Sequence, residues 1–219
     1  MKTITLSLPL KMGTVNCYLV KTGTGYILID TGSSNQRGVL ESELESAGCR
    51  SGNLDLVVLT HGDFDHAGNA AYLGKTFGAK IAMHEDDAGM VERGDMFWNR
   101  QTGNVLLRWL SPILFGFGKQ KRFSPDLFVE DRSDLSAHGF DARIVDLPGH
   151  SKGSIGILTA GGDLFCGDLF ENTEKPALNS IMDDLAAANA SVERLAGMGI
   201  KTVYPGHGSP FSMDMLRQP

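Results

Sequence analysis

The sequence predicts an α/β fold in which two sheets pack face to face between outer helices, forming a four-layer αββα sandwich. The chain has 219 residues, and in each half short, β-branched apolar runs precede stretches with helical spacing. In both halves, residues that commonly bind metals stand where apolar runs end. The carboxyl ends of strands are where ligands gather in sheets that helices flank, so these residues are expected along one edge of the sandwich.

The first half begins with strand-like segments. Residues 3–8, 15–20 and 26–30 are alternating or continuous apolar runs and predict a meander of three strands. Apolar residues at helical spacing follow over 39–47. The run 54–59 is short, apolar and β-branched, which predicts a buried strand directly before the most polar motif of the chain.

The remaining elements alternate between helix and strand. Residues 66–76 predict a helix with a turn of glycine and alanine, and residues 80–83 predict another strand. The last helix is expected over about 182–196, with a capping box formed by Ser180 and Asp183. We expect a single domain over residues 1–219, because a chain of this length and composition can bury one substantial core.

Four residues with metal-binding side chains lie within six positions directly after the run 54–59. They are His61, Asp63, Asp65 and His66. Imidazole and carboxylate ligands together suit Zn, Fe or Mn, whereas an all-oxygen set would indicate Mg or Ca. Four such groups would crowd one centre, so two adjacent metals could share them. This spacing predicts a metal site rather than an ordinary loop.

Three more residues of the same kinds each end or follow an apolar run beside a glycine or proline turn: His150, Asp168 and His207. Two other histidines are expected not to bind metal. Acidic residues follow His84 as in the first turn of a helix, where they complement the helix dipole, and His138 stands in a polar turn.

These motifs resemble the metallo-β-lactamase superfamily, most closely its glyoxalase II and lactonase-like single-domain hydrolases. The family signature is His-x-His-x-Asp-His followed by single His, Asp and His residues, and the resemblance runs from Thr14 to Pro210. It implies the same sandwich fold and a pair of metal ions. Asp30 matches an acid of the family's first loop, which supports the site from behind the ligands. The resemblance implies one metal held by His61 and His150, a second held by Asp65, His66 and His207, and Asp168 bridging the two.

Asp63 occupies the place where the family signature has its second histidine. Some branches carry an acid there, including the diiron domains of flavodiiron proteins. If Asp63 is a terminal ligand of the first metal, the extra carboxylate lowers the net positive charge and favours Fe or Mn relative to Zn. The alternative is a neutral family variant that still binds Zn. The expected cofactors are therefore two divalent ions, Zn or Fe, with Mn as a third option.

The function that we expect is metal-dependent hydrolysis of an ester, thioester or lactone by a metal-bound hydroxide, because bound metals lower the pKa of water toward about 7. By analogy with the family, Asp65 would ligate the second metal and also act in catalysis, by orienting the hydroxide or passing its proton onward. Two alternatives stay open. One is a diiron domain that reduces oxygen or nitric oxide, and the other is a non-catalytic binding module that metal stabilises.

Residues 94–123 break the pattern and contain both tryptophans of the chain, Trp98 and Trp109. We interpret them as an insertion with its own apolar surface. It either packs on the core or on a second copy in a homodimer, or it forms a substrate lid. In the lid interpretation, Trp98 and Trp109 line the substrate pocket.

Composition argues against nucleic-acid and membrane partners, and the partner that we expect is a small-molecule substrate. The net charge of -6 and the pI near 5.5 argue against nucleic acid, which is bound largely through Lys and Arg. No run reaches the ~18 apolar residues of a membrane span, and the first residues lack the apolar core of a signal peptide. Cys17, Cys49 and Cys166 are odd in number and widely spaced, which favours a reducing cytoplasm. Cys166 is close to Asp168 in sequence, yet we expect a buried structural thiol.

Overall fold

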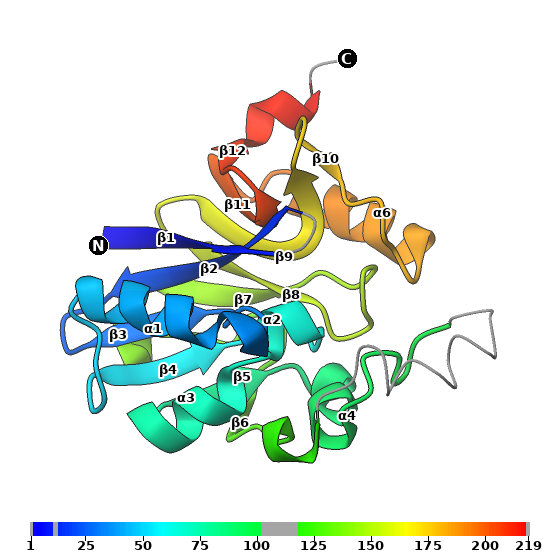
Figure 1. Cartoon of the computed structure of the whole chain (residues 1–219). Coiled ribbons are helices and arrows are strands. Elements are labelled where there is room, and N and C mark those ends of the chain that lie inside the picture. Colours follow the sequence, from blue (N-terminus) through cyan, green and yellow to red (C-terminus); the bar gives the residue numbers. More distant parts are fainter. Residues whose placement is uncertain (1, 11–12, 102–117, 218–219) are drawn as a thin grey trace.

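The computed structural model describes residues 2–10, 13–101 and 118–217. Within these residues, two six-stranded sheets pack face to face with helices on their outer faces (Figure 1). The first sheet has the order β1-β2-β3-β4-β5-β6, and the second has the order β12-β11-β9-β8-β7, with β10 paired to β9. The predicted αββα sandwich is confirmed.

The first half of the chain supplies the first sheet and most of the described helices. Its antiparallel meander of β1, β2 and β3 is as predicted, and β3 to β6 then run parallel. The bounds of the elements are β1 (Lys2–Pro9), β2 (Thr14–Lys21), β3 (Tyr26–Ile29), α1 (Arg37–Ser46), β4 (Leu54–Val58), α2 (Phe64–Ala67), α3 (Ala70–Phe77), β5 (Lys80–Met83), α4 (Glu85–Arg93) and β6 (Leu127–Phe128).

The single helix predicted over 66–76 is instead two helices, α2 and α3, which meet at Gly68 and Asn69. The break has a physical reason. The buried side-chain amide of Asn69 donates to the carbonyl oxygens of Thr31 at 2.8 Å and Ser33 at 3.0 Å. Asn69 thereby ties the loop after β3 to the end of the loop after β4, and both loops border the candidate site.

The second half forms the other sheet, in which β7, β8 and β9 are antiparallel and β11 runs parallel to β9. The last helix begins later than predicted. Asp184, not Ser180 or Asp183, caps it, because the Asp184 carboxylate accepts a hydrogen bond from the Ala187 amide at 2.9 Å. The bounds are β7 (Ala142–Asp146), β8 (Ile155–Thr159), β9 (Asp163–Asn172), β10 (Ala177–Leu178), α6 (Leu185–Leu195), β11 (Thr202–Gly208) and β12 (Phe211–Ser212).

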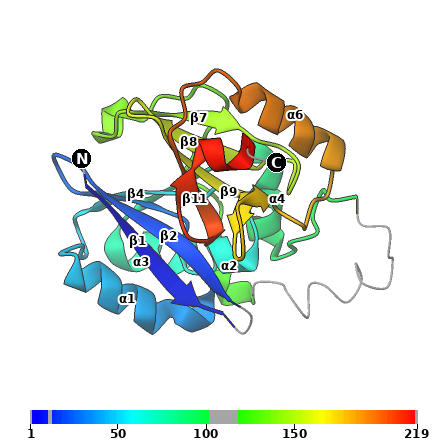
Figure 2. The same cartoon turned by 90° about the horizontal axis from the view of Figure 1, so that it is seen from above.

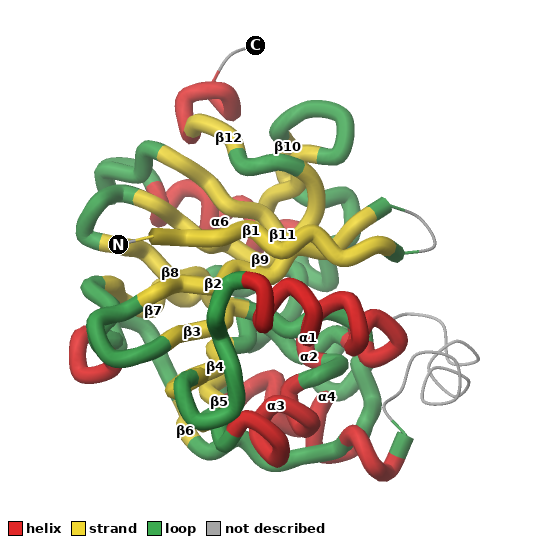
Figure 3. The backbone as a smooth tube through the Cα atoms, turned by 60° about the vertical axis from the view of Figure 1, so that its left-hand side comes forward, coloured by secondary structure: helices red, strands yellow, loops and turns green. Residues whose placement is uncertain are grey.

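Three clusters of buried apolar residues lie between the successive helix and sheet layers of the sandwich. In β3, Leu28 packs toward the helices that cover the first sheet, and its neighbours Ile27 and Ile29 pack between the two sheets. Ala188 and Leu195 of α6 pack on the outer face of the second sheet. Figures 2 and 3 show α1 and α6 on opposite outer faces with the strands between them. Alternate burial on both faces explains why β3 reads as a continuous apolar run.

The three cysteines are buried and free, and the burial expected for Cys166 is confirmed. Burial raises the pKa of Cys166 to about 12. Within the described part of the chain, none of the helices combines the length and apolar content that a membrane span needs.

The predicted insertion at 94–123 is described only at its two ends. Trp109 lies outside the described residues, which stop at Gln101 and resume at Gly118. The second end continues into a short 3-10 helix, η2 (Lys119–Lys121). Its role as a core element, a homodimer contact or a lid therefore stays a prediction.

Candidate metal centre

The candidate ligands meet at one edge of the sandwich, although they come from both halves of the chain. They follow β4, lie between β7 and β8, and stand on β9 and β11. The structure brings all seven into three overlapping groups, in each of which the ligand atoms lie within 4.8 Å of one another. The groups are His61, Asp63 and His150; His61, His66 and Asp168; and Asp65, His66 and His207.

Two of the four imidazoles are oriented by backbone carbonyls. The Nδ1 atom of His150 lies 2.7 Å from the carbonyl oxygen of Ile181, and that of His207 lies 2.7 Å from the carbonyl oxygen of Thr14. A carbonyl oxygen only accepts, so both Nδ1 atoms carry a hydrogen and donate it. The Nε2 lone pair of each ring is thereby left for the cluster, as in histidines that bind metals.

Asp30 orients the other two imidazoles. Its Oδ2 atom accepts from His66 Nδ1 at 2.9 Å and from the Thr60 hydroxyl at 2.7 Å. Because the Thr60 hydroxyl gives its hydrogen to Asp30, its oxygen accepts from His61 Nδ1 at 3.0 Å. Asp30 has a φ of 58°, in the left-handed region that non-glycine residues rarely adopt. Asp30 therefore contacts His66 from the side away from its Nε2 atom, and its support of a metal site stays a prediction.

Several buried polar atoms of the cluster have no hydrogen-bond partner among the described residues. They are His61 Nε2, Asp63 Oδ1, His66 Nε2, Asp168 Oδ1 and the Nε and Nη2 atoms of Arg100. A buried polar atom without a partner costs about 1–3 kcal/mol, so a structure seldom leaves several of them side by side. Divalent metal ions would satisfy the imidazole and carboxylate atoms among them, and this mixed donor set suits Zn, Fe or Mn. The residues therefore fit the metals that the sequence predicts.

Asp168 lies between the two sides of the cluster. Its Oδ1 atom is 3.4 Å from His66 Nε2, and its Oδ2 atom is 3.3 Å from His207 Nε2 and 3.9 Å from His150 Nε2. Burial alone would raise the pKa of Asp168, but His66 and His207 hold that pKa well below its usual value. The carboxylate therefore stays ionised, and its Oδ2 atom lies within 4 Å of both His207 and His150.

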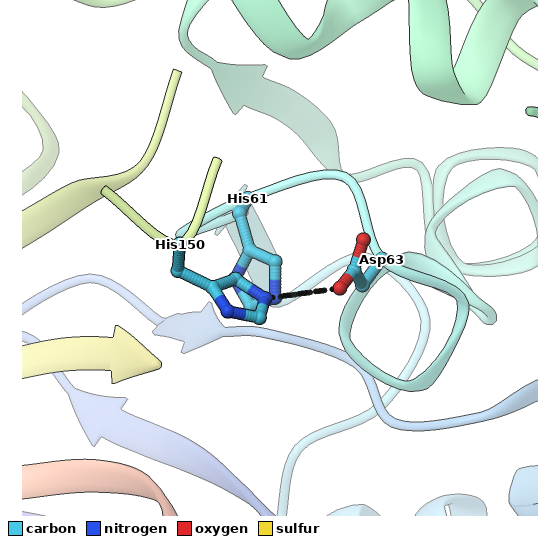
Figure 4. Close-up of side chains that lie close together, drawn as sticks. All are labelled: His61, Asp63 and His150. Atoms are coloured by element: carbon cyan, nitrogen blue, oxygen red, sulfur yellow. Dashed lines mark hydrogen bonds and ion pairs between the residues drawn. The ribbon is translucent and has the colours of Figure 1, made fainter. Parts of the chain in front are cut away.

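Asp63 faces two different partners. Its Oδ2 atom lies 3.0 Å from His150 Nε2 and 3.7 Å from His61 Nε2, and Figure 4 shows the three side chains turned toward one another. Its Oδ1 atom lies 2.9 Å from Nη2 of Arg100. Burial opposes ionisation, yet the Arg100 guanidinium keeps the pKa of Asp63 below its usual value. The motif alone gave no signal for Arg100, which belongs to the segment predicted as an insertion.

Asp87 is a second residue that sequence reasoning missed. Its buried carboxylate accepts hydrogen bonds from the Gly62 amide at 3.1 Å, the Ser151 hydroxyl at 2.6 Å and the Gly153 amide at 2.9 Å. Asp87 thus joins the loop that carries His61 and Asp63 to the loop that carries His150. The sequence indicated only that acids begin the helix after His84.

The two other histidines lie outside the three metal-ligand groups that the described residues form. His84 is the N-cap of α4, where its Nδ1 atom accepts from the Asp86 amide at 3.1 Å. His138 ends the 3-10 helix η3 (Ser136–His138).

Trp98 packs against α4. The Arg93 guanidinium lies 3.8 Å from the centroid of its ring. A Cβ atom at Gly89 would come within 2.1 Å of the indole Nε1, so only glycine lets the indole lie this close to the helix. The side chain is 37% exposed, and its contact with substrate stays a prediction.

Comparisons with known proteins identify the family of the chain. The model of the metallo-beta-lactamase superfamily matches residues 10–207. Probable metallo-hydrolase MJ0888 of Methanocaldococcus jannaschii is 27% identical, over 88% of this chain and 87% of that protein. Hydroxyacylglutathione hydrolase GloC of Haemophilus influenzae is 29% identical, over 68% of this chain and 71% of that protein. The chain spans only 58% of the length of another relative, the Beta-lactamase-like protein 2 homolog of Drosophila melanogaster, which is 25% identical.

Solved structures share the fold of this chain. A metallo-beta-lactamase family protein from Thermus thermophilus superposes with a TM-score of 0.72 and 25% identity, over 96% of this chain and 74% of that one. TTHA1623 in a di-iron-bound form also has a TM-score of 0.72 and 25% identity, over 98% and 96% of the two chains. The chain belongs to the metallo-beta-lactamase superfamily.

Proposed function

We propose that the chain hydrolyses an ester, thioester or lactone at a centre of two divalent metal ions. The observation that carries the proposal is the common orientation of four imidazoles. Each Nδ1 atom is held by an oxygen acceptor, and each Nε2 atom is left for a cluster around the Asp168 carboxylate. Such pre-oriented donors are typical of metal sites, in which residues behind the ligands fix the tautomer of each histidine.

The distances support a definite division of the ligands. His61, Asp63 and His150 would hold one ion, and Asp65, His66 and His207 would hold the other. Asp168 has an oxygen within 3.4 Å of His66 Nε2 and another within 3.9 Å of His150 Nε2, which favours a bridging position. When bound, these ions supply Lewis acidity, which polarises a carbonyl group and lowers the pKa of water.

Asp65 is the carboxylate best placed to move a proton. The side chain of Asp65 is 15% exposed, against 7% for both Asp63 and Asp168. Its Oδ2 atom lies 3.5 Å from His207 Nε2, and burial raises the pKa of the carboxyl group. A carboxylate with a raised pKa that remains open to solvent is a better proton acceptor than the enclosed acids beside it.

A thioester is the first substrate class to test. Hydroxyacylglutathione, the compound in the name of the Haemophilus influenzae relative, is a thioester, and this relative covers 68% of the chain. The likeness supports the glyoxalase II-like branch of the expected subtypes. Esters and lactones react through the same attack on a carbonyl carbon, so they belong in the same panel.

The test compares metal-free protein with protein reloaded with Zn, Mn or Fe(II) on thioester, ester and lactone substrates. We expect turnover only in the loaded forms, and its loss in Asp168→Ala. Asp134→Ala is the matched control, because the Asp134 carboxylate is exposed and bonded only locally, to Ser136. Absence of turnover by every loaded form across the panel would reject the hydrolase proposal.

One observation favours a second candidate, a diiron domain that reduces oxygen or nitric oxide. A protein that superposes over 98% of this chain has been solved in a di-iron-bound form, and Asp63 adds a carboxylate to the donor set. Iron-loaded protein should then consume oxygen or nitric oxide in the presence of a reductant. Metal uptake with neither activity would instead favour a binding module that metal stabilises.

A further inference from the structure

Arg100 is a buried arginine that reaches the candidate metal centre from outside the ligand motif. It is 8% exposed, and its Nη2 atom lies 2.9 Å from Asp63 Oδ1. The turn that carries it is anchored on both sides. The Arg100 amide donates to the Phe97 carbonyl at 3.2 Å, and the next amide, of Gln101, donates to Asp183 Oδ1 at 2.8 Å. The backbone therefore holds the guanidinium at this place.

In this ion pair, the two carboxylate oxygens of Asp63 face different groups. Oδ1 faces Arg100, whereas Oδ2 faces His150 and His61 at 3.0 and 3.7 Å (Figure 4). Oδ2 is therefore the oxygen of Asp63 that faces the candidate metal ligands.

The charges of the pair also cancel. A carboxylate contributes one negative charge to a metal site, and the guanidinium beside it contributes one positive charge. A neutral imidazole, which the family signature has at this position, contributes none. The sequence alone indicated that Asp63 lowers the net charge of the first metal site, and the buried Arg100 removes the reason for that expectation.

We propose that Asp63 and Arg100 together replace the missing histidine as one neutral ligand unit that presents a single oxygen to the first metal. Arg100 is a positioning residue in this unit, because it acts through Asp63. The inference rests on the proposed metal centre. It also changes the consequence of restoring the family histidine: Asp63→His alone would leave the Arg100 guanidinium buried without its partner.

The experiment is a double-mutant cycle of the parent, Arg100→Met, Asp63→His and the double variant. Breaking a buried ion pair from either side is costly, so each single change should lower the Tm by roughly 6 to 20 °C. Each should also weaken binding of the first metal about tenfold or more. The double variant, with a histidine and no buried charge, should return to within about threefold of the parent affinity.

Cobalt absorption separates positioning from mere structural support. In Co(II)-loaded Arg100→Met, both oxygens of Asp63 are free to approach the metal, and the visible bands should weaken as the coordination number rises. Arg100→Lys keeps one positive charge beside Oδ1 and should restore the parent spectrum. Arg93→Met is the matched control, because Arg93 is an exposed arginine that stacks on Trp98 near the same turn.

The outcomes separate this inference from the proposed function. If the parent takes up no metal, the metal centre is wrong and the ligand unit falls with it. If the parent loads metal but the double variant binds it no better than Asp63→His, the metal centre stands and the ligand unit is rejected. A parent-like cobalt spectrum in folded Arg100→Met would also overturn the positioning role.

Discussion

Removing the Asp87 carboxylate should destabilise the fold and weaken metal binding together. Asp87→Ala leaves the amides of Gly62 and Gly153 without their acceptor, whereas the Ser151 hydroxyl can turn to Ser154 at 2.7 Å. Two unsatisfied amides cost about 1–3 kcal/mol each, and removal of a buried charge offsets part of that cost. We expect a net loss of about 2–4 kcal/mol, which is a fall in Tm of roughly 4 to 16 °C.

The effect on the metal follows from which loops Asp87 joins. One loop carries His61 and Asp63, and the other carries His150, so their separation should weaken metal affinity about 10–100-fold. Urea unfolding of the metal-free protein and titration with a competing chelator measure the two effects separately. Asp86→Ala is the control, because this neighbouring acid is partly exposed and, among the described residues, pairs with Lys152 at 3.1 Å and His84 at 4.0 Å rather than with the loops that carry the ligands. Equal stability and equal metal affinity in the two variants would refute the reasoning.

Three other predictions follow from particular contacts. Asp30→Asn should lower metal affinity about 10–100-fold, since an amide group cannot accept all three hydrogen bonds that Asp30 accepts from Thr60 and His66. Competition with a chelator measures the affinity, and an unchanged value would contradict the prediction. The three thiols should not react with a thiol reagent at pH 8 until the protein unfolds. Cys17, Cys49 and Cys166 are buried, and burial raises the pKa of both Cys49 and Cys166 to about 12. Fast labelling of the native protein would contradict the buried positions. Trp98→Ala should raise KM or change acyl-chain preference at full metal occupancy, whereas an altered oligomeric mass with unchanged preference would make the segment a subunit contact.

The layers of the fold could be predicted because both sheets are buried on two faces. Strands such as β3 and β4 then appear as short continuous apolar runs, which the sequence shows directly. Element boundaries were harder to predict. The interruption between α2 and α3 depends on Asn69 bonding to a loop more than thirty residues earlier in the chain, and no local pattern reports such a contact.

The same distinction applies to the candidate site. The ligand-type residues could be found because each is a His or Asp at the end of an apolar run. Asp87 and Arg100 were missed because their roles depend on which distant groups they contact, namely Gly62, Gly153 and Asp63. An acid early in a helix has an ordinary explanation, and a single arginine after a helix has no motif. Their significance appears only in three dimensions.

The amount of metal that the protein binds tests the proposed two-metal centre most directly. Metal-free protein should be reloaded with Zn, Mn or Fe(II), freed of excess metal by gel filtration and measured by plasma emission. Because Asp168 lies between the two groups of ligands, the parent should bind about two ions per chain, and Asp168→Ala should lose most of both. Saturation of the parent at one ion, or full loading of Asp168→Ala, would contradict a centre of two metals that this carboxylate bridges.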